Sequence, residues 1–232
     1  SSAASDVYKR QPNTYLSDSE YERYDSVLKD AVEYFESNAR LEGVIEGGVA
    51  IFAAGNEAAT AADYPGAYNK YIAVSAMSAD YTATYYTNYG PGTNISAPGG
   101  DQDYYWNYVD EYHNYGEVGC ILSTLPYNVS ESGYGFMEGT SMACPQVSGV
   151  VAPAISYAAE QCIQLTPDQI KELICSTATD IDPYMVGKKE YRRYVADIGP
   201  LQPMQMDLAP FKGQMGAGQI NAARLLLSLI HI

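Results

Sequence analysis

The chain has 232 residues, of which 47% are hydrophobic and 18% are charged, so it is long and apolar enough to form a buried core. Its 28 acidic residues outnumber its 13 lysines and arginines, and the resulting net charge of −15 argues against nucleic acid or an anionic membrane surface as a partner. No run of about 18 to 20 apolar residues predicts a membrane span, and the 2 histidines and 4 cysteines have no zinc-binding spacing.

The first two predicted elements are a helix and a buried strand. Residues 17–41 place apolar side chains at steps of three and four, which is the spacing of one helical face. Ser17 and Glu20 match a capping box at the start of this helix. The apolar run at 49–54 contains no polar alternation, which is typical of a strand covered on both faces in a parallel sheet.

Three further strands are predicted at residues 71–76, 94–97 and 120–124, separated by loops rich in Gly and Pro. We expect them to share one core with the first strand. The elements together predict an α/β fold, a mostly parallel sheet with helices on both faces.

The C-terminal half is predicted to be mainly helical. Residues 140–161 are small and apolar and indicate a largely buried helix that tolerates two prolines. Thr166 precedes a proline and a glutamine in the pattern of a capped helix start. Residues 182–214 have no clear period, and residues 221–229 indicate a closing helix.

Two segments carry residues suited to chemistry, 53–57 at the end of a predicted strand and 139–145 at the start of a predicted helix. A serine at a helix N-terminus has a free backbone N–H and lies at the positive end of the helix dipole, so Ser141 is a candidate nucleophile. Asn56 could donate its side-chain N–H to the same oxyanion. Considered separately, Ser141 also fits a helix cap and Asn56 also fits a turn.

The order of several motifs resembles the C-terminal part of a subtilisin-like serine protease catalytic domain, with the likeness running from about residue 31 to residue 226. The motifs are AAGNE, YPGAYNKYIAVSA, TNYGPGTNISAPGG, ILSTLPYN, GYGFMEGTSMACPQVSG, LTPDQIKELICSTATD and GAGQINAARLL.

This resemblance implies that Ser141 is the nucleophile and that Asn56 is the side-chain oxyanion donor. It further implies that Ala53, Ala54 and Gly55 form one side of the pocket for the residue before the cleaved bond. The implied function is that of a serine endopeptidase acting on protein or peptide substrates.

Family members supply a triad aspartate and histidine from motifs that precede the oxyanion asparagine, and the chain contains neither motif. Its histidines are His113, in an aromatic segment, and His231, near the end. We therefore expect a fragment that lacks the triad Asp and His and is inactive alone. The alternative is a non-catalytic subtilase-like binding or regulatory module.

The expected domain is residues 12–227, the C-terminal part of one peptidase domain. Residues 1–11 and 228–232 are expected to be foreign or disordered ends, since they resemble translated adapter sequence. The resemblance implies no cofactor for the chemistry, allows structural calcium, and implies a secreted or cell-envelope location, although the chain shows no targeting signal. It also places a tight turn at Tyr64–Pro65, where we predict a cis peptide bond.

Two other residue types offer alternatives to the serine chemistry. The 23 tyrosines could stack on sugars, but tyrosine also serves as a half-buried strand and loop residue. Cys144 follows Ser141 by three positions and is expected to pack as a small apolar group rather than act as a thiol nucleophile. Cys162 and Cys175 could form a disulfide in an exported protein.

Overall fold

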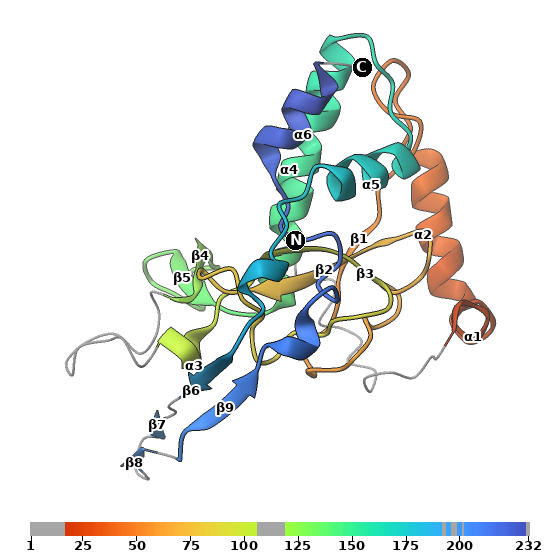
Figure 1. Ribbon diagram of the computed structural model, residues 1–232. Helices are drawn as coiled ribbons and strands as arrows, with labels where there is room; N and C mark the ends of the chain where they lie inside the picture. The colour runs from red at the N-terminus through yellow and green to blue at the C-terminus, as the bar shows by residue number, and fades with distance from the viewer. Residues whose placement is uncertain (1–16, 106–118, 192–193, 196–198, 201, 231–232) are drawn as a thin grey trace.

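The computed structural model describes residues 17–105, 119–191, 194–195, 199–200 and 202–230. Within these residues one parallel sheet lies at the centre of the molecule (Figure 1). Its strands are β1 (Ile51–Ala53), β2 (Ile72–Met77) and β3 (Thr93–Pro98), in the order β1-β2-β3. Because the three strands are parallel, their carboxyl ends lie at one edge of the sheet, where α/β proteins build their sites.

The long helix α4 (Thr140–Glu160) crosses one face of this sheet and contacts all three strands. Ile72, Val74 and Ala76 of β2 face α4 and belong to the main core cluster. The residues between them point to the other face, which is covered by loops and by the short turn η5 (Ala209–Phe211). The alternation buries β2 completely, and the predicted α/β class and parallel sheet are confirmed.

The first strand is packed on both faces, as predicted, since Ile51 contacts the main core cluster and Phe52 contacts the cluster of Tyr21, Tyr68 and Tyr71. All three residues of β1 are only half-buried, although their sequence is as apolar as that of β2. The reason is topological, because among the described strands β1 lies at the edge of the parallel sheet, with β2 as its one hydrogen-bonded neighbour.

The predicted N-terminal helix is two helices, α1 (Asp18–Tyr24) and α2 (Ser26–Asn38). The chain leaves the helical conformation at Asp25, whose φ and ψ are −126° and 32°. The start is as predicted, since the Ser17 side chain accepts a hydrogen bond from the N–H of Glu20 at 3.3 Å. No residue of α2 is fully buried, so the apolar pattern of this segment faces solvent over much of its length.

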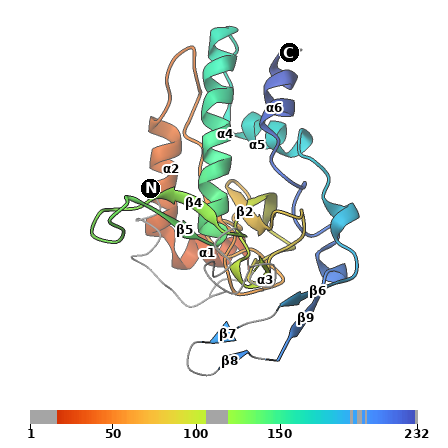
Figure 2. The same cartoon turned by 90° about the vertical axis from the view of Figure 1, so that its left-hand side faces the viewer.

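The remaining helices confirm the sequence analysis. Helix α5 (Pro167–Ser176) begins with the predicted capping box of Thr166 and Gln169, and α6 (Ala222–Leu229) is capped by Asn221. Both pack with α4 in the main core, and Figure 2 shows α5 and α6 beside the upper half of α4. A short helix, α3 (Gln102–Tyr105), follows β3.

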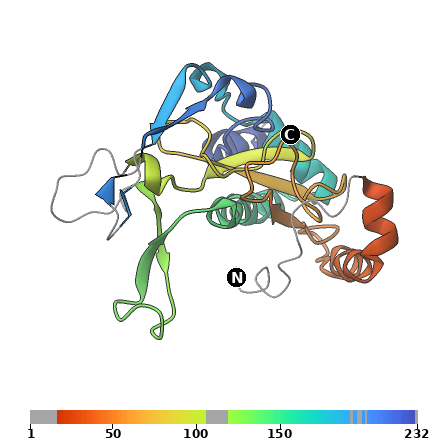
Figure 3. The same cartoon turned by 90° about the horizontal axis from the view of Figure 1, so that it is seen from below.

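The strand expected at 120–124 exists but does not join the parallel sheet, and none of its residues belongs to a core cluster of the described residues, so the expectation that it shares one core with the first strand is wrong. It is β4 (Ile121–Thr124), which pairs antiparallel with β5 (Tyr134–Met137) in a hairpin that projects from the body in Figure 3. Sequence analysis missed β5, and its antiparallel pairing keeps β4 out of the sheet.

The segment without a clear period forms an arm of paired strands. Strand β6 (Lys188–Tyr191) pairs with β9 (Met204–Asp207), and β7 (Tyr194–Val195) pairs with β8 (Gly199–Pro200). A turn, η4 (Asp182–Tyr184), precedes the arm. The Tyr64–Pro65 peptide bond is cis, as predicted. Among the described residues, no helix combines the length and apolarity that a bilayer span requires.

Candidate active site

The two segments chosen from the sequence meet at the carboxyl edge of the sheet. Asn56 lies three residues after the end of β1, and Thr140 begins α4. The Asn56 side-chain oxygen Oδ1 accepts a hydrogen bond from the Thr140 N–H at 2.8 Å and another from the Thr140 hydroxyl at 2.9 Å. The structure therefore brings Asn56 beside Ser141, the next residue of the helix.

This contact fixes the orientation of the Asn56 amide. A backbone N–H can only donate, so the group facing Thr140 must be the amide oxygen, and the Nδ2 group points away from it. In the described part of the chain, neither Asn56 Nδ2 nor the Ser141 N–H takes part in a hydrogen bond with another residue. Two N–H donors from two elements are therefore free for a ligand oxygen at this corner.

Ser141 is the second residue of α4 and is half-buried. Gly139 caps the helix with φ of 143°, a conformation that favours glycine, so the chain turns sharply into the helix just before the serine. Ser141 has its N–H in the first turn, at the positive end of the helix dipole. Both features would stabilise the negatively charged intermediate that forms when a serine attacks a carbonyl group.

Among the described residues, no side chain is hydrogen-bonded to the Ser141 hydroxyl. The two histidines, His113 and His231, both lie outside the described ranges, so their relation to Ser141 is not part of the structure. The Gln146 side chain of α4 donates to the carbonyl oxygens of Pro98 and Met142 at 2.6 and 3.0 Å. It links α4 to the end of β3.

The proposed pocket residues differ in exposure. Ala53 and Gly55 are half-buried, whereas Ala54 is fully buried and packs with Ala62 and Ala73. Gly55 has φ of 111°, and a Cβ there would collide with the side chains around it. The small side chains of this segment thus serve the packing of its own turn, and their part in a substrate pocket stays a prediction.

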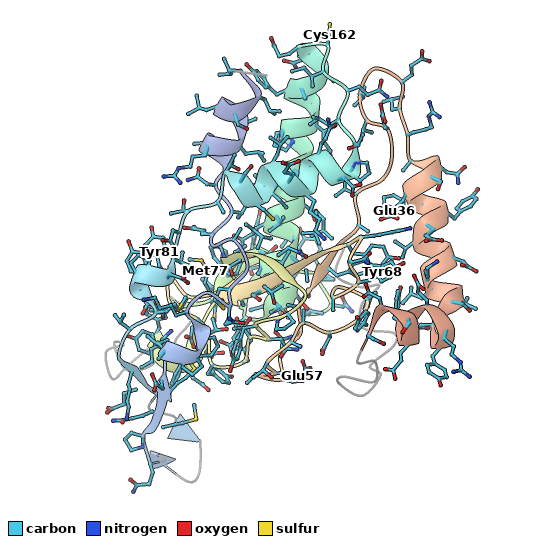
Figure 4. All side chains as sticks on the ribbon, turned by 45° about the vertical axis from the view of Figure 1, so that its right-hand side comes forward. Glu36, Glu57, Tyr68, Met77, Tyr81 and Cys162 are labelled. Carbon is cyan, nitrogen blue, oxygen red and sulfur yellow. The ribbon has the colours of Figure 1, made fainter. Side chains whose placement is uncertain are left out.

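Sequence reasoning missed the residues that hold the turn containing Asn56. Asn88 is fully buried and forms hydrogen bonds with Ala54, Glu57 and Ala59. The motif TNYG contained this residue, but a buried asparagine cannot be distinguished from a loop asparagine by its neighbours in the sequence. Figure 4 labels Glu57 below the sheet, whereas Cys162 lies at the top of the view.

The cysteines do not contribute to this corner as nucleophiles. The Cys144 thiol donates to the carbonyl oxygen of Ile51 at 3.5 Å, and burial raises its pKa to about 11. This supports the expected packing role. All four cysteines are free, so Cys162 and Cys175 are not joined in the structure.

Several tyrosines pack on one another inside the protein. Tyr21 and Tyr71 are fully buried and Tyr68 is nearly so, with ring centroids 5.0 to 6.4 Å apart. This cluster explains these tyrosines without a sugar ligand. Much of the second tyrosine-rich segment lies at residues 106–118, outside the described residues.

A buried ion pair lies at the end of β3. Lys189 of β6 donates to Asp101 at 2.7 Å, and the Tyr191 hydroxyl donates to the same carboxylate oxygen at 2.9 Å. Burial raises the pKa of Asp101 to about 6, against the opposing attraction of Lys189. Within the described ranges, no group of three His, Cys, Asp or Glu side chains could hold a metal ion, so no residues are assigned to calcium.

Comparison with known proteins identifies relatives of the chain. The family model described as Peptidase S8, the subtilase family, matches residues 7–196, which is most of the chain. Halolysin from Haloferax mediterranei is 31% identical over 131 residues, covering 56% of this chain and 20% of halolysin. An extracellular basic protease from Dichelobacter nodosus is 31% identical over 137 residues, covering 57% of this chain and 20% of that protein.

Solved structures show the same fold. A protease from Pseudoalteromonas arctica PAMC 21717 is 25% identical with a TM-score of 0.54, covering 79% of this chain and 43% of that one. The prenylagaramide maturation protease PagA is 22% identical with a TM-score of 0.57, covering 88% of this chain and 56% of that one. The chain thus spans about a fifth of these two curated relatives and about half of these two structures.

Proposed function

Since this chain belongs to the subtilase family, we propose that it carries the nucleophile and the oxyanion hole of a serine endopeptidase. The observation that carries the proposal is the pair of hydrogen bonds from Thr140 to Asn56 Oδ1. These bonds turn Asn56 Nδ2 away from Thr140 and leave it available beside the free N–H of Ser141. Acyl transfer requires two N–H donors directed at the oxyanion beside the serine, and we propose that Asn56 Nδ2 and the Ser141 N–H supply them.

In the proposed reaction, the Ser141 hydroxyl oxygen forms a bond to the carbonyl carbon of the substrate peptide and loses its proton to a base. The carbonyl π electrons move onto the oxygen, and Asn56 Nδ2 and the Ser141 N–H stabilise the resulting negative charge. The carbon–nitrogen bond then breaks, and the amine leaves with a proton returned by the base. Water hydrolyses the remaining ester and regenerates the Ser141 hydroxyl.

The base is proposed to be a histidine that the present sequence does not contain. His113 and His231 both follow Asn56 in the chain, whereas the family resemblance implies a histidine that precedes it. Serine is a weak nucleophile at neutral pH without a positioned base. We therefore expect the 232-residue chain alone to be inactive. The protein extended upstream to include the aspartate and histidine motifs of the family, called the full-length protein below, is expected to be active.

Protein or peptide substrates follow from the family, and an extracellular location is supported by the name of the Dichelobacter relative. Structural calcium remains an expectation from the resemblance, with no residues of this chain assigned to it. Ala53, Ala54 and Gly55 are proposed to border the pocket through their backbone, since Ala54 has no exposed side chain. Residues 12–227 are proposed to form the C-terminal part of one peptidase domain.

The test labels two proteins, the 232-residue chain and the full-length protein, with a fluorophosphonate probe that reacts with activated serines. We expect labelling only of the full-length protein, and none after Ser141→Ala. Ser148→Ala is the control, because Ser148 lies two turns along the same helix and is exposed. Absence of labelling in the full-length protein would favour a non-catalytic binding or regulatory module, and stoichiometric labelling of the short chain would show that a base exists within it.

A further inference from the structure

The buried side chain of Asn88 is hydrogen-bonded to the turn that contains Asn56. Asn88 uses every hydrogen-bonding position of its amide. Its oxygen accepts the N–H groups of Glu57 and Ala59 at 3.0 and 2.9 Å, and its Nδ2 group donates to the Ala54 carbonyl and to Glu57 Oε2, both at 3.1 Å. The residues immediately before and after the Gly55–Asn56 pair are therefore bound to the same amide.

Glu57 extends this contact to Asn56 itself. Its Oε2 atom, which accepts from Asn88, also accepts the backbone N–H of Asn56 at 2.7 Å. The Asn88 N–H donates to the Gly55 carbonyl at 3.0 Å. A Cβ on Gly55 would meet Asn88 and Glu57 directly, so the turn is closed tightly around the Asn88 amide.

The start of α4, which carries Ser141, is hydrogen-bonded to Tyr86, which lies two residues before Asn88 in the chain. The Tyr86 hydroxyl lies 2.9 and 2.6 Å from the carbonyl oxygens of Gly99 and Gly100 and shares its one proton between them. Its oxygen accepts the N–H of Gly139 at 3.0 Å, and Gly139 is the cap of the helix that carries Ser141. Tyr86 is 7% exposed, so water competes little for this hydroxyl.

We propose that Asn88 and Tyr86 are positioning residues of the oxyanion hole, with Asn88 acting through Asn56 and Tyr86 through the Gly139 cap. Neither residue needs to touch the substrate. Both residues belong to the segment 86–88, whose backbone also forms hydrogen bonds with Gly55 and Ala58 beside Asn56. This segment therefore sets the distance between the two oxyanion donors. The inference rests on the proposed function, since it assigns the residues a role in peptide hydrolysis.

The first test is a double-mutant cycle in the full-length protein, read as kcat and KM on a chromogenic peptide anilide. Asn88→Asp keeps the acceptor oxygen but places a second oxygen against Ala54 and Glu57, so we expect kcat to fall about 10²-fold with KM changed less than about threefold. In the Asn56→Ala background the same change should lower kcat by less than about threefold. An equal loss in both backgrounds would overturn the proposal, because a purely structural role does not depend on Asn56.

Asn88→Ala covers the case in which Asn88→Asp folds poorly, because it removes the amide without placing a second carboxylate beside Glu57. We expect kcat to fall at least about tenfold with KM changed less than about threefold, and kcat to fall by less than about threefold in the Asn56→Ala background. Asn69→Asp, an exchange of the same type at an exposed position, should leave kcat within about twofold. An equal loss of kcat in both backgrounds for a folded Asn88→Ala protein would contradict a positioning role.

Tyr86→Phe tests the role of the Tyr86 hydroxyl, since it removes this oxygen and keeps the ring. We expect kcat to fall about tenfold with KM unchanged, and an unchanged kcat would remove Tyr86 from the proposal.

If the full-length protein does not hydrolyse peptides, the proposed function fails, and amide hydrogen exchange then tests the inference separately. In Asn88→Asp the backbone amides of Glu57 and Ala59 should exchange faster, and the resonance of the Asn56 side-chain amide should shift. Neither change is expected in Asn69→Asp. Unchanged signals in Asn88→Asp would overturn the inference.

Discussion

The side-chain oxygen of Asn56 accepts both the N–H and the hydroxyl of Thr140, at 2.8 and 2.9 Å, across 84 positions of the chain. The two residues belong to different elements, since Asn56 follows β1 and Thr140 begins α4. The pair therefore couples the orientation of the Asn56 amide to the start of the helix that carries Ser141.

Two variants of Asn56 separate this structural coupling from the proposed role of Asn56 as an oxyanion donor. Asn56→Ala removes the acceptor and the donor, so both the melting temperature and kcat should fall. Asn56→Asp keeps the oxygen that Thr140 uses but replaces the Nδ2 donor with a second oxygen. We expect kcat of the full-length protein to drop at least about 10² to 10³-fold in both, the loss known for removal of this donor from subtilisin itself.

The melting temperature distinguishes the two variants, because Asn56→Asp retains the bonds to Thr140. It should melt close to the unaltered protein, whereas Asn56→Ala should melt several degrees lower. An Asn56→Asp protein with full kcat would show that the side-chain donor takes no part in the reaction.

Gly55 and Gly149 offer matched glycine substitutions. Gly55→Ala puts a Cβ against Asn88, Asp63 and Glu57 at φ of 111°, so it should lower the free energy of unfolding by about 1 to 3 kcal/mol. Gly149 lies inside α4, where an added Cβ would meet nothing within 4 Å, so Gly149→Ala should raise it by about 0.5 to 1 kcal/mol. Urea unfolding of both variants measures the difference, and equal effects would contradict the tight turn.

Stability should depend on pH through Asp101. Its pKa is raised to about 6 by burial, against the attraction of Lys189 and with a smaller raising effect of Glu138. An unfolded aspartate titrates near 3.9, so the folded state holds the proton more tightly. The stability from this proton is fully present below about pH 4 and is lost as the pH rises through about 6, by up to about 3 kcal/mol.

The measurement is urea unfolding between pH 4 and pH 7. Asp101→Asn cannot titrate, so the part of the pH dependence that comes from Asp101 should disappear. Asp30→Asn, at an exposed position of α2, should retain it. An identical pH dependence in Asp101→Asn and the unaltered protein would show that another group is responsible.

The thiols should differ in reactivity. Burial raises the pKa of Cys144 to about 11, so about one thiol in a thousand is ionised at pH 8. Cys162 is exposed at the far end of α4. Iodoacetamide at pH 8, followed by mass spectrometry, should modify Cys162 well before Cys144, and equal rates would contradict the burial of Cys144.

Local sequence signals determined the starts of α1, α5 and α6 and the positions of the strands in the parallel sheet. Ser17, Thr166 and Asn221 each cap a helix with a side chain that reaches an N–H three residues on, and such contacts need no distant partner. The completely buried strand β2 was evident from its apolar sequence. Motif order was enough to select Ser141 and Asn56 before any geometry was known.

Tertiary structure decided what depends on residues far apart in the chain. The exposure of β1 follows from its place at the sheet edge, and the separate hairpin of β4 follows from pairing with a strand that the sequence analysis had missed. Asn88 and Tyr86 gain their roles from partners 29 to 53 residues away. A hydrogen bond of that span forms only when the whole sheet has assembled, so the sequence near each residue carries no sign of it.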